Sequence, residues 1–274
     1  MNRISFNGAN VVAEQLNWNM TKGWSEGDSA TSAYYAPLAT FEQRFDAFIG
    51  KVVDAGFDTV DIWSAMVSYK WATDSHLTAA NRVLSEHGVT VVSYGAGFGA
   101  TPDEFRRANE VILGLGCRLL GGRTPLLDSD RAATLAILGE YHTVLAIENH
   151  PERNTEELTA QIGTDQDGLL AATVDTGWFA TQGFDPARAL RELGPAVAHV
   201  HLKDIRAAGA HDTCALGDGI VDIADCVAAL DDIAYQGVIS IEHEPEHYNP
   251  YPEVVTSKAR LLEILDGRRS GSAA

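Results

Sequence analysis

The sequence predicts an α/β fold, a single (β/α)8 barrel in which parallel strands alternate with helices. The chain has 274 residues, and about 250 residues are typical of one such barrel. Short apolar runs alternate with amphipathic stretches, and no Pro/Gly/Ser-rich linker interrupts them. Several of the apolar runs end in acidic or histidine residues. We therefore expect one domain over residues 1–274, with a flexible C-terminal tail from about residue 268.

The first half of the chain supplies four of the expected strands. Residues 10–14 form a plausible first strand, and a long loop with several aromatic residues follows it. Loops of this length in compact domains are usually functional or disordered. We expect the segment 18–36 to be a lid whose aromatic side chains, Trp18 among them, stack on a ligand; a mobile surface loop is the alternative. The other strands are expected at 59–63, 89–94 and 118–123, and helices are expected to begin at Thr40, Leu77 and Thr101 and to end at Gly56, Gly88 and Gly116.

The second half repeats the alternation. Strands are expected at 144–147, 170–174, 197–202 and 238–241, and helices at 128–141, 186–193, 221–235 and 253–265, with a short helix capped by Asn154. Strand–helix pairs with short connections favour a closed barrel. A doubly wound open sheet is the structural alternative, but Gly95-Ala96-Gly97-Phe98-Gly99 lacks the G-x-G-x-x-G spacing of a dinucleotide fold.

Composition excludes several classes of function. The formal net charge of −18 argues against binding to nucleic acid or to an anionic membrane surface, because both are polyanions. Three scattered cysteines (Cys117, Cys214 and Cys226) are too few for a disulfide framework or a thiolate zinc site. The first residues lack the apolar run of a signal peptide, and no stretch approaches the ~20 apolar residues of a membrane span. We expect a cytoplasmic protein.

Four successive strands of the second half end in potential metal ligands. Alternation directs Glu148, Asp175, His201 and Glu242 toward the barrel interior, and barrel enzymes place their catalytic groups at this end of the strands. Three carboxylates and one imidazole suit Mn²⁺ or Mg²⁺, with Co²⁺, Fe²⁺ or Zn²⁺ also possible. Without a cation, carboxylates this close would raise one another's pKa. The sequence therefore predicts a divalent metal site, with Glu244 as the rival for the last position.

Neighbouring polar side chains are candidates for substrate chemistry. His150 lies two residues beyond Glu148 on the same face, so it is favoured as the group that polarises a substrate oxygen or protonates a leaving group. Lys203 could do the same, although Lys203 and Asp204 could equally form a salt-bridged rim. His199 is expected to be a hydrogen-bonded histidine of a lower layer. Further candidates of this kind are Arg123, Arg206 and His211.

Several motifs together resemble a known family. They are Val174-Asp175-Thr176-Gly177, His199-Val200-His201-Leu202-Lys203-Asp204, Gly217-Asp218-Gly219 and Tyr235-Gln236-Gly237-Val238-Ile239-Ser240-Ile241-Glu242-His243-Glu244. Residues 144–246 that contain them resemble the sugar phosphate isomerase/epimerase family, the xylose isomerase-like TIM barrels. The first half resembles it only in its strand–helix rhythm and in Ala55-Gly56-Phe57-Asp58-Thr59-Val60-Asp61-Ile62.

The resemblance implies a metal, most fittingly Mn²⁺, bound by Glu148, Asp175, His201 and Glu242. It also implies that Glu148 and Glu242 act as an acid/base pair across the substrate. One position departs from the family pattern Asp-x-Gly-His, because Trp178 stands where the histidine is common. That change removes a ligand of a trinuclear zinc site and offers an apolar platform to a sugar ring or an aglycone. The substrate-binding side chains expected from all these observations are Trp178, Lys203, Arg206, His211, Trp18 and Glu244.

These features predict an enzyme. The favoured function is a divalent-metal-dependent sugar isomerase or epimerase that acts on an unphosphorylated keto sugar through a metal-stabilised enediolate. The alternative is a lyase or dehydratase of the same fold, which would perform β-elimination on an inosose or a 3-keto-glycoside and could involve a small partner subunit. A non-catalytic sugar- or metal-binding barrel is a third possibility, but it leaves Glu148 and Glu242 without a role. By analogy with relatives we expect a homo-oligomer.

Overall fold

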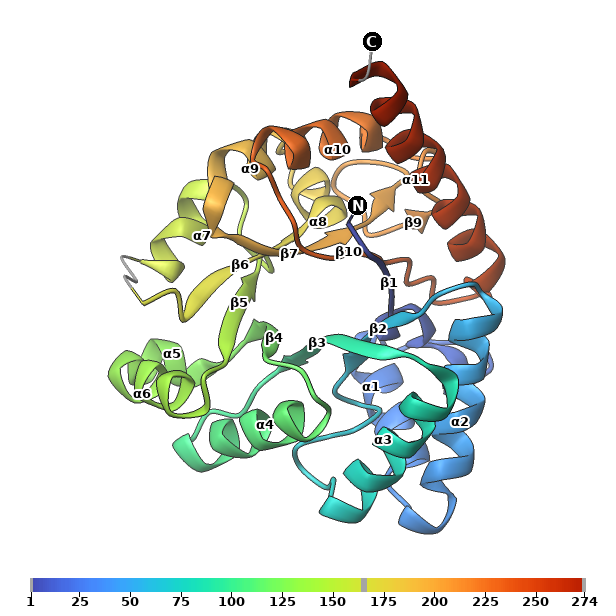
Figure 1. Cartoon of the computed structure of the whole chain (residues 1–274), viewed down its shortest axis with the longest axis vertical. Coiled ribbons are helices and arrows are strands. Elements are labelled where there is room, and N and C mark those ends of the chain that lie inside the picture. Colours follow the sequence, from blue (N-terminus) through green and yellow to red (C-terminus); the bar gives the residue numbers. More distant parts are fainter. Residues whose placement is uncertain (1, 164–166, 273–274) are drawn as a thin grey trace.

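The barrel is closed by parallel strands, as the sequence predicts. The computed structural model describes residues 2–163 and 167–272, and in this part of the chain the strand order is β1-β10-β7-β6-β5-β4-β3-β2. Figure 1 looks along the barrel and shows the strands inside a ring of helices. The strands are β1 Ile4–Asn7, β2 Thr59–Trp63, β3 Thr90–Gly97, β4 Leu119–Arg123, β5 Val144–Glu148, β6 Leu170–Asp175, β7 Val197–Leu202 and β10 Ile239–Ile241.

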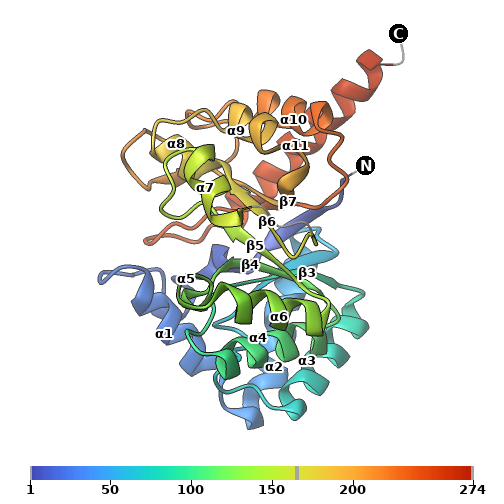
Figure 2. The same cartoon turned by 90° about the vertical axis from the view of Figure 1, so that its left-hand side faces the viewer.

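The helices cover the outside of the barrel. Figure 2 shows α1 to α6 on one side of the strands and α7 to α11 on the other. The helices are α1 Trp24–Tyr35, α2 Leu38–Asp54, α3 Asp74–His87, α4 Pro102–Gly114, α5 Pro125–Ser129, α6 Arg131–Tyr141, α7 Thr155–Ile162, α8 Thr176–Thr181, α9 Pro186–Leu193, α10 Ile223–Asp232 and α11 Tyr251–Ser272. Short 3-10 turns occupy Gly8–Val11, Glu14–Leu16 and Gly194–Ala196, and the strands β8 Asp204–Ile205 and β9 Thr213–Cys214 pair in a separate antiparallel sheet.

The core lies between the strands and the helices. Every residue of β2 is buried, as expected for a parallel strand covered on both faces. Helix α2 buries Phe41, Phe45, Phe48, Ile49 and Val52, a spacing that places these side chains on one helical face. This packing fixes the strand ends, and with them the side chains at the mouth of the barrel.

The predicted first strand is wrong. Residues 10–14 fall in and between the 3-10 turns, and β1 is the earlier segment Ile4–Asn7. Strand β1 ends just before Gly8, which packs closely against β2: a Cβ there would lie 2.7 Å from the carbonyl oxygen of Asp61. Strand β1 is hard to predict because it is only four residues long and includes two polar residues, Ser5, which contacts Asp61 at the barrel floor, and Asn7, which lines the cavity.

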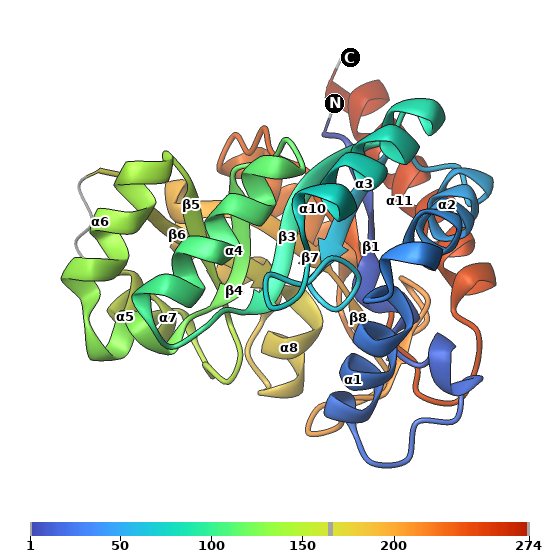
Figure 3. The same ribbon diagram turned by 90° about the horizontal axis from the view of Figure 1, so that it is seen from below.

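The predicted long loop at 18–36 is also corrected, because most of it is helix α1. The helix buries Gly27, Thr31 and Tyr35 at intervals of four residues, a helical spacing hidden by its small polar residues. Glu26 accepts hydrogen bonds from the backbone N–H groups of Thr21 and Lys22 at 2.9 and 2.8 Å and so closes the start of the helix. Figure 3 shows α1 and α8 at one end of the barrel and both chain ends at the other.

Helix α11 runs through Ser272, so it extends beyond residue 268, where the sequence predicts a flexible tail. The mobility of that tail stays a prediction, and residues 273–274 lie outside the described residues. Within the described segments, no helix has the length and apolar character needed to cross a membrane.

Candidate metal and active site

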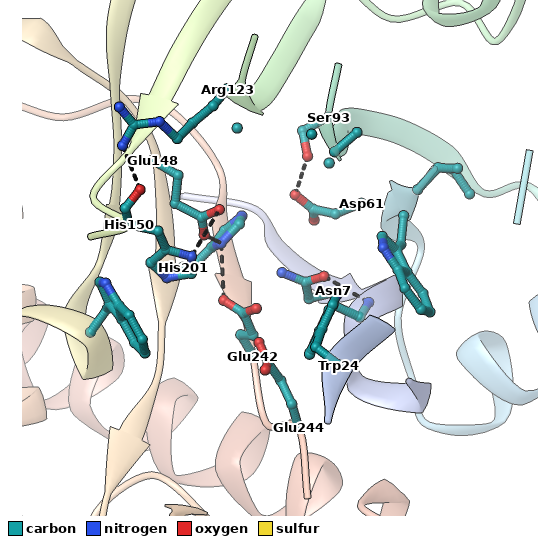
Figure 4. A pocket seen from close by; sticks show the side chains of 18 of the residues that line it. Asn7, Trp24, Asp61, Ser93, Arg123, Glu148, His150, His201, Glu242 and Glu244 are labelled. Carbon is teal, nitrogen blue, oxygen red and sulfur yellow. Dashed lines mark hydrogen bonds and ion pairs between the residues drawn. The ribbon is translucent and has the colours of Figure 1, made fainter. Parts of the chain in front are cut away.

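A cavity of about 460 Å³ opens at the carboxyl ends of the strands. Its position agrees with the usual place of active sites in this fold. The cavity wall includes the sequence-predicted residues Glu148, His150, Trp178, His201, His211, Glu242 and Glu244. Figure 4 shows the carboxylates of Glu148 and Glu242 directed toward the imidazole of His201.

Three of the four predicted ligands meet in one cluster. Glu148 ends β5, His201 lies in β7 and Glu242 follows β10, and one ligand atom from each lies within 4.8 Å of the others. The Nδ1 atom of His201 is 2.7 Å from Oε1 of Glu148 and 2.9 Å from Oε2 of Glu242. One Nδ1 proton cannot serve both carboxylates, and Oε2 of Glu242 is buried without a hydrogen-bond partner among the described residues. A divalent cation would satisfy this donor set, so the residues present fit a metal.

The fourth predicted ligand, Asp175, is committed to other partners. Its Oδ1 accepts a hydrogen bond from the backbone N–H of Trp178 at 3.0 Å. Its Oδ2 lies 2.8 Å from Nζ of Lys203 and 3.2 Å from Nε2 of His150. Asp175 instead joins Glu148 and His150 in a second group of potential ligands. The role of Asp175 as a ligand stays a prediction, and it requires these contacts to rearrange.

Lys203 and Asp204 are not a rim, because both side chains are fully buried. Lys203 pairs with Asp175, and it also lies 2.8 Å from Oε1 of Glu244. Asp204 accepts hydrogen bonds from backbone N–H groups of Gly217, Gly219 and Val221. The Gly217-Asp218-Gly219 motif is thereby tied to the end of β7. Glu244 is absent from the cluster around His201, so Glu242 is the better placed of the two rivals.

One wall of the cavity combines an indole with two imidazoles. The ring of Trp178 lies 4.4 Å from that of His150 and 5.2 Å from that of His211, measured between centroids. His211 also lies 3.2 Å from Oε2 of Glu244. The two histidines are the more open groups, with 36% and 33% of their side-chain surfaces exposed. This wall could bind an apolar ring face and supply protons beside it.

Three predicted substrate-binding residues are absent from the cavity wall: Lys203, Arg206 and Trp18. Arg206 is half-exposed and pairs with Asp212 at 3.6 Å. Trp18 packs on an apolar cluster that contains Met20. Trp24 lines the cavity instead, with its ring 5.5 Å from that of Trp63. Trp24 was part of the aromatic segment noticed in the sequence, but no sequence signal ranked it above Trp18.

Arg123 also lines the cavity, where it stabilises the loop after β5. Its guanidinium donates to both carboxylate oxygens of Glu152, at 2.7 and 2.9 Å, and to the backbone carbonyl of His150. Glu152 is buried, so its charge is balanced by Arg123. We infer that Arg123 acts mainly by holding His150 at the cavity.

A polar network forms the floor of the cavity. The sequence predicted its histidine but not its central carboxylate. Asp61 of β2 is buried and accepts hydrogen bonds from Ser5, Ser93 and Ser240, and its carboxylate also contacts Nε2 of His199. The prediction that His199 is a hydrogen-bonded lower-layer histidine is confirmed. Although burial opposes the charged form, His199 and Ser5 hold the pKa of Asp61 below its usual range. The signal in the sequence was one acidic residue inside the apolar run 59–63.

Replacing the floor carboxylate is expected to cost stability. Asp61→Ala leaves three hydroxyls and an imidazole without their acceptor, and each buried polar group left without a partner costs about 1–3 kcal/mol. Urea unfolding measures this loss. Asp58→Ala is the control, because Asp58 is exposed and its ion pair with Arg3 is long, at 3.7 Å; a change of under ~1 kcal/mol is expected there. Equal effects of the two variants would show that the network is not stabilising.

The electrostatics of the cluster predict how metal binding depends on pH. Burial opposes protonation of His201, but Glu242 and Glu148 outweigh it and raise the pKa of the imidazole well above its usual range. Burial, assisted by Glu244, raises the pKa of Glu242 to about 8. In the absence of metal this cluster therefore holds at least one proton near neutral pH, and a bound cation would take its place.

Metal affinity is accordingly expected to increase with pH. Each proton displaced from the cluster makes the dissociation constant for Mn²⁺ fall by roughly tenfold per pH unit, until the pKa of His201 is passed. Calorimetric titration in two buffers of different ionisation enthalpy counts the protons released. Binding that is independent of pH and releases no proton would contradict the assignment of His201.

Comparison with known proteins agrees with this geometry. A family model described as the xylose isomerase-like TIM barrel matches residues 130–264. The chain is a xylose isomerase-like TIM barrel. The match covers the strands that carry Glu148, Asp175, His201 and Glu242, which is also where the sequence motifs are concentrated.

Curated relatives of this xylose isomerase-like barrel include inosose dehydratases. The one from Lacticaseibacillus casei is 24% identical over 162 residues, which cover 53% of this chain and 53% of the relative. The one from Clostridium beijerinckii is 26% identical over 129 residues, which cover 40% of this chain and 43% of the relative. The matches thus span about half the length of these relatives.

Solved structures share the fold over more of the chain. An L-ribulose 3-epimerase superposes with a TM-score of 0.70 at 16% identity and covers 100% of this chain and 97% of its own. A probable 3-DHS dehydratase from Bacillus anthracis gives a TM-score of 0.66 at 11% identity, with 96% and 99% covered. At these identities the likeness establishes the architecture, which epimerases and dehydratases both use.

Proposed function

We propose that this xylose isomerase-like barrel is a divalent-metal-dependent isomerase or epimerase of a keto sugar. The observation that carries the proposal is the approach of Glu148 and Glu242 to one side of His201, at 2.7 and 2.9 Å. The two carboxylates come from β5 and from the end of β10, and both line the cavity. Two carboxyl groups that face a shared space can remove a proton on one side of a substrate and return it on the other.

The metal would be held by Glu148, His201 and Glu242, with Asp175 as a further ligand after rearrangement, and Mn²⁺ is our first choice. A bound divalent ion would polarise the substrate carbonyl and so favour loss of a proton from the neighbouring carbon. Glu148 would accept that proton, because His150 and His201 outweigh the effect of burial, lower its pKa and so keep its carboxylate ionised. Glu242, which reaches the cavity from the end of another strand, would return a proton from the other side.

The substrate would lie between the carboxylates and the Trp178 wall. The indole offers an apolar face, while His150 and His211 are placed to donate hydrogen bonds to hydroxyls. Among the described residues Arg123 is the only Arg or Lys side chain in the cavity wall, and it is paired with Glu152. This arrangement favours an unphosphorylated sugar.

A lyase of the same fold is the second candidate. Two observations favour it: the curated relatives are inosose dehydratases, and the two histidines beside Trp178 could protonate a leaving group. In that case Glu148 would again remove the proton next to a carbonyl, but a group β to the carbonyl would then depart. The substrate would be an inosose or a 3-keto-glycoside.

A product screen separates the two candidates. The Mn²⁺-loaded protein is incubated with ketohexoses, inososes and 3-keto-glycosides, and the products are resolved by chromatography and mass spectrometry. A product of unchanged mass, an epimer or an aldose, supports the isomerase. A product that has lost water or released its aglycone supports the lyase, and no turnover of any member contradicts both.

A further inference from the structure

Lys203 is a fully buried cation beside the candidate metal cluster. Its Nζ lies 2.8 Å from Oδ2 of Asp175, 2.8 Å from Oε1 of Glu244 and 3.4 Å from Oε1 of Glu242. An ammonium group is costly to bury unless several acceptors surround it. The three carboxylates that surround Lys203 come from the ends of two strands, and Lys203 itself does not line the cavity wall.

The last residue of β6 and the two that follow it contact Lys203 along its length. The hydroxyl of Thr176 accepts a hydrogen bond from the backbone N–H of Lys203 at 2.9 Å and donates one to its carbonyl at 2.7 Å. A Cβ on Gly177 would lie only 2.6 Å from Cγ of Lys203, so a glycine is needed where the aliphatic stem passes. Asp175, Thr176 and Gly177 thus contact the head, the backbone and the stem of Lys203.

The lysine orients the two glutamates after β10 in different directions. In Glu242, Oε1 faces Lys203, while Oε2 lies 2.9 Å from Nδ1 of His201 and has no hydrogen-bond partner among the described residues. In Glu244, Oε1 faces Lys203, while Oε2 contacts His211 at 3.2 Å. One ammonium group therefore directs Glu242 into the metal cluster and Glu244 toward the cavity wall.

We propose that Lys203 is a positioning residue that holds Oε1 of Glu242 so that its Oε2 faces the metal and the substrate, and that Thr176 and Gly177 serve to place Lys203. The proposal rests on the proposed function, in which Glu242 is one half of the acid/base pair. It adds a role for the Asp175-Thr176-Gly177 segment, which is to set the direction of a carboxylate on another strand.

The test compares Lys203→Met with the unmodified protein, both as the full chain with Mn²⁺ titrated in. The variant keeps a long apolar stem but loses the charge. Misplacing a reacting group by ~1 Å can cost about 100-fold in rate, so we expect kcat at saturating Mn²⁺ to fall about 100-fold with KM changed less than about threefold. The loss of a partner that orients a metal ligand also weakens metal binding by about 10–100-fold, which calorimetry measures without any substrate.

Two further variants keep every charge in place. Gly177→Ala pushes on the stem of Lys203, and Thr176→Val removes both contacts to its backbone. Both are expected to weaken Mn²⁺ binding and kcat in the same direction as Lys203→Met, whereas Thr176→Ser, which retains the hydroxyl, is expected to resemble the unmodified protein. Lys22→Met is the matched control, because Lys22 is exposed. If Lys203→Met fails to fold, the Mn²⁺ affinity and kcat of Gly177→Ala and Thr176→Val test the proposal.

The metal readout separates this proposal from the proposed function. Folded Lys203→Met, Gly177→Ala and Thr176→Val with Mn²⁺ affinity and kcat within about threefold of the unmodified protein would overturn the positioning role. If the unmodified protein turns over no sugar, the proposed function fails. Weaker Mn²⁺ binding in the three variants would still support Lys203 as the residue that orients Glu242.

Discussion

Glu148→Gln is expected to reduce turnover by about 100- to 10,000-fold, the range that one general base contributes. The substitution preserves the shape of the side chain but removes its charge and replaces one acceptor oxygen with an amide nitrogen. The amide cannot take up a proton from carbon. The fold is expected to persist, because Glu148 is partly open to the cavity, with 16% of its side chain exposed.

Steady-state kinetics with a substrate from the product screen, together with circular dichroism, checks this expectation. Glu86→Gln is the matched control, since Glu86 is exposed on α3 and is expected to leave kcat unchanged. Mn²⁺ content is measured in both variants, so that a loss of metal is not mistaken for a loss of the base. Full activity of a metal-loaded Glu148→Gln variant would remove Glu148 from the mechanism.

His201→Ala is expected to abolish tight metal binding. His201 is the only residue that lies within ligand distance of both Glu148 and Glu242 in the described cluster. Without it the cluster keeps only its two carboxylates, which repel each other when no ion is bound. We expect affinity for Mn²⁺ to fall by at least about 100-fold, the upper end of what is lost when only an orienting partner is removed.

Thermal unfolding with and without Mn²⁺ measures this effect. A ligand present at about 100 times its dissociation constant stabilises a protein by about 2.7 kcal/mol, so Mn²⁺ is expected to raise the melting temperature of the unmodified protein and not that of His201→Ala. His247→Ala is the control, because His247 is 65% exposed. Stoichiometric metal in dialysed His201→Ala would contradict the ligand assignment.

The inward-facing side chains in the second half of the chain could be predicted because strand alternation is local. In β7 the period of two places His199 and His201 on one face, and both side chains point inward as expected. The same rule brought Glu148 and Glu242 to the cavity. Helix caps could be predicted in the same way: the side chain of Asn154 accepts a hydrogen bond from the backbone N–H of Glu157 at the start of α7, as predicted.

Local patterns of this kind do not predict which side chains on different strands contact one another. Asp175 points inward, but its oxygens are taken by Lys203, His150 and the N–H of Trp178. Nothing in the sequence ranks these partners above a metal ion. The floor network was missed for the same reason, because Ser5 and Ser240 acquire their meaning only when the closed barrel brings them to Asp61.

The aromatic contact at the cavity was predicted from a segment that was wrongly expected to be a loop. The buried positions of α1 are mostly small or polar, so its helical pattern is weak, and Trp18 was predicted as the aromatic contact in place of Trp24. In the structure the helix begins at Trp24 and places this indole at the cavity. Helical burial at Gly27, Thr31 and Tyr35 uses weakly hydrophobic positions, which the apolar periodicity of the sequence does not reveal.

Proton exchange next to a substrate carbonyl tests the central claim most directly. Proton NMR in D₂O follows the protein loaded with Mg²⁺, which avoids paramagnetic broadening, in the presence of ketohexoses, inososes and 3-keto-glycosides. We predict that deuterium enters the carbon beside the carbonyl and that the signals of an epimer or an aldose appear, with both processes suppressed in Glu148→Gln. Unchanged substrate spectra, with no deuterium uptake from any member of the panel, would contradict carbanion chemistry at this site.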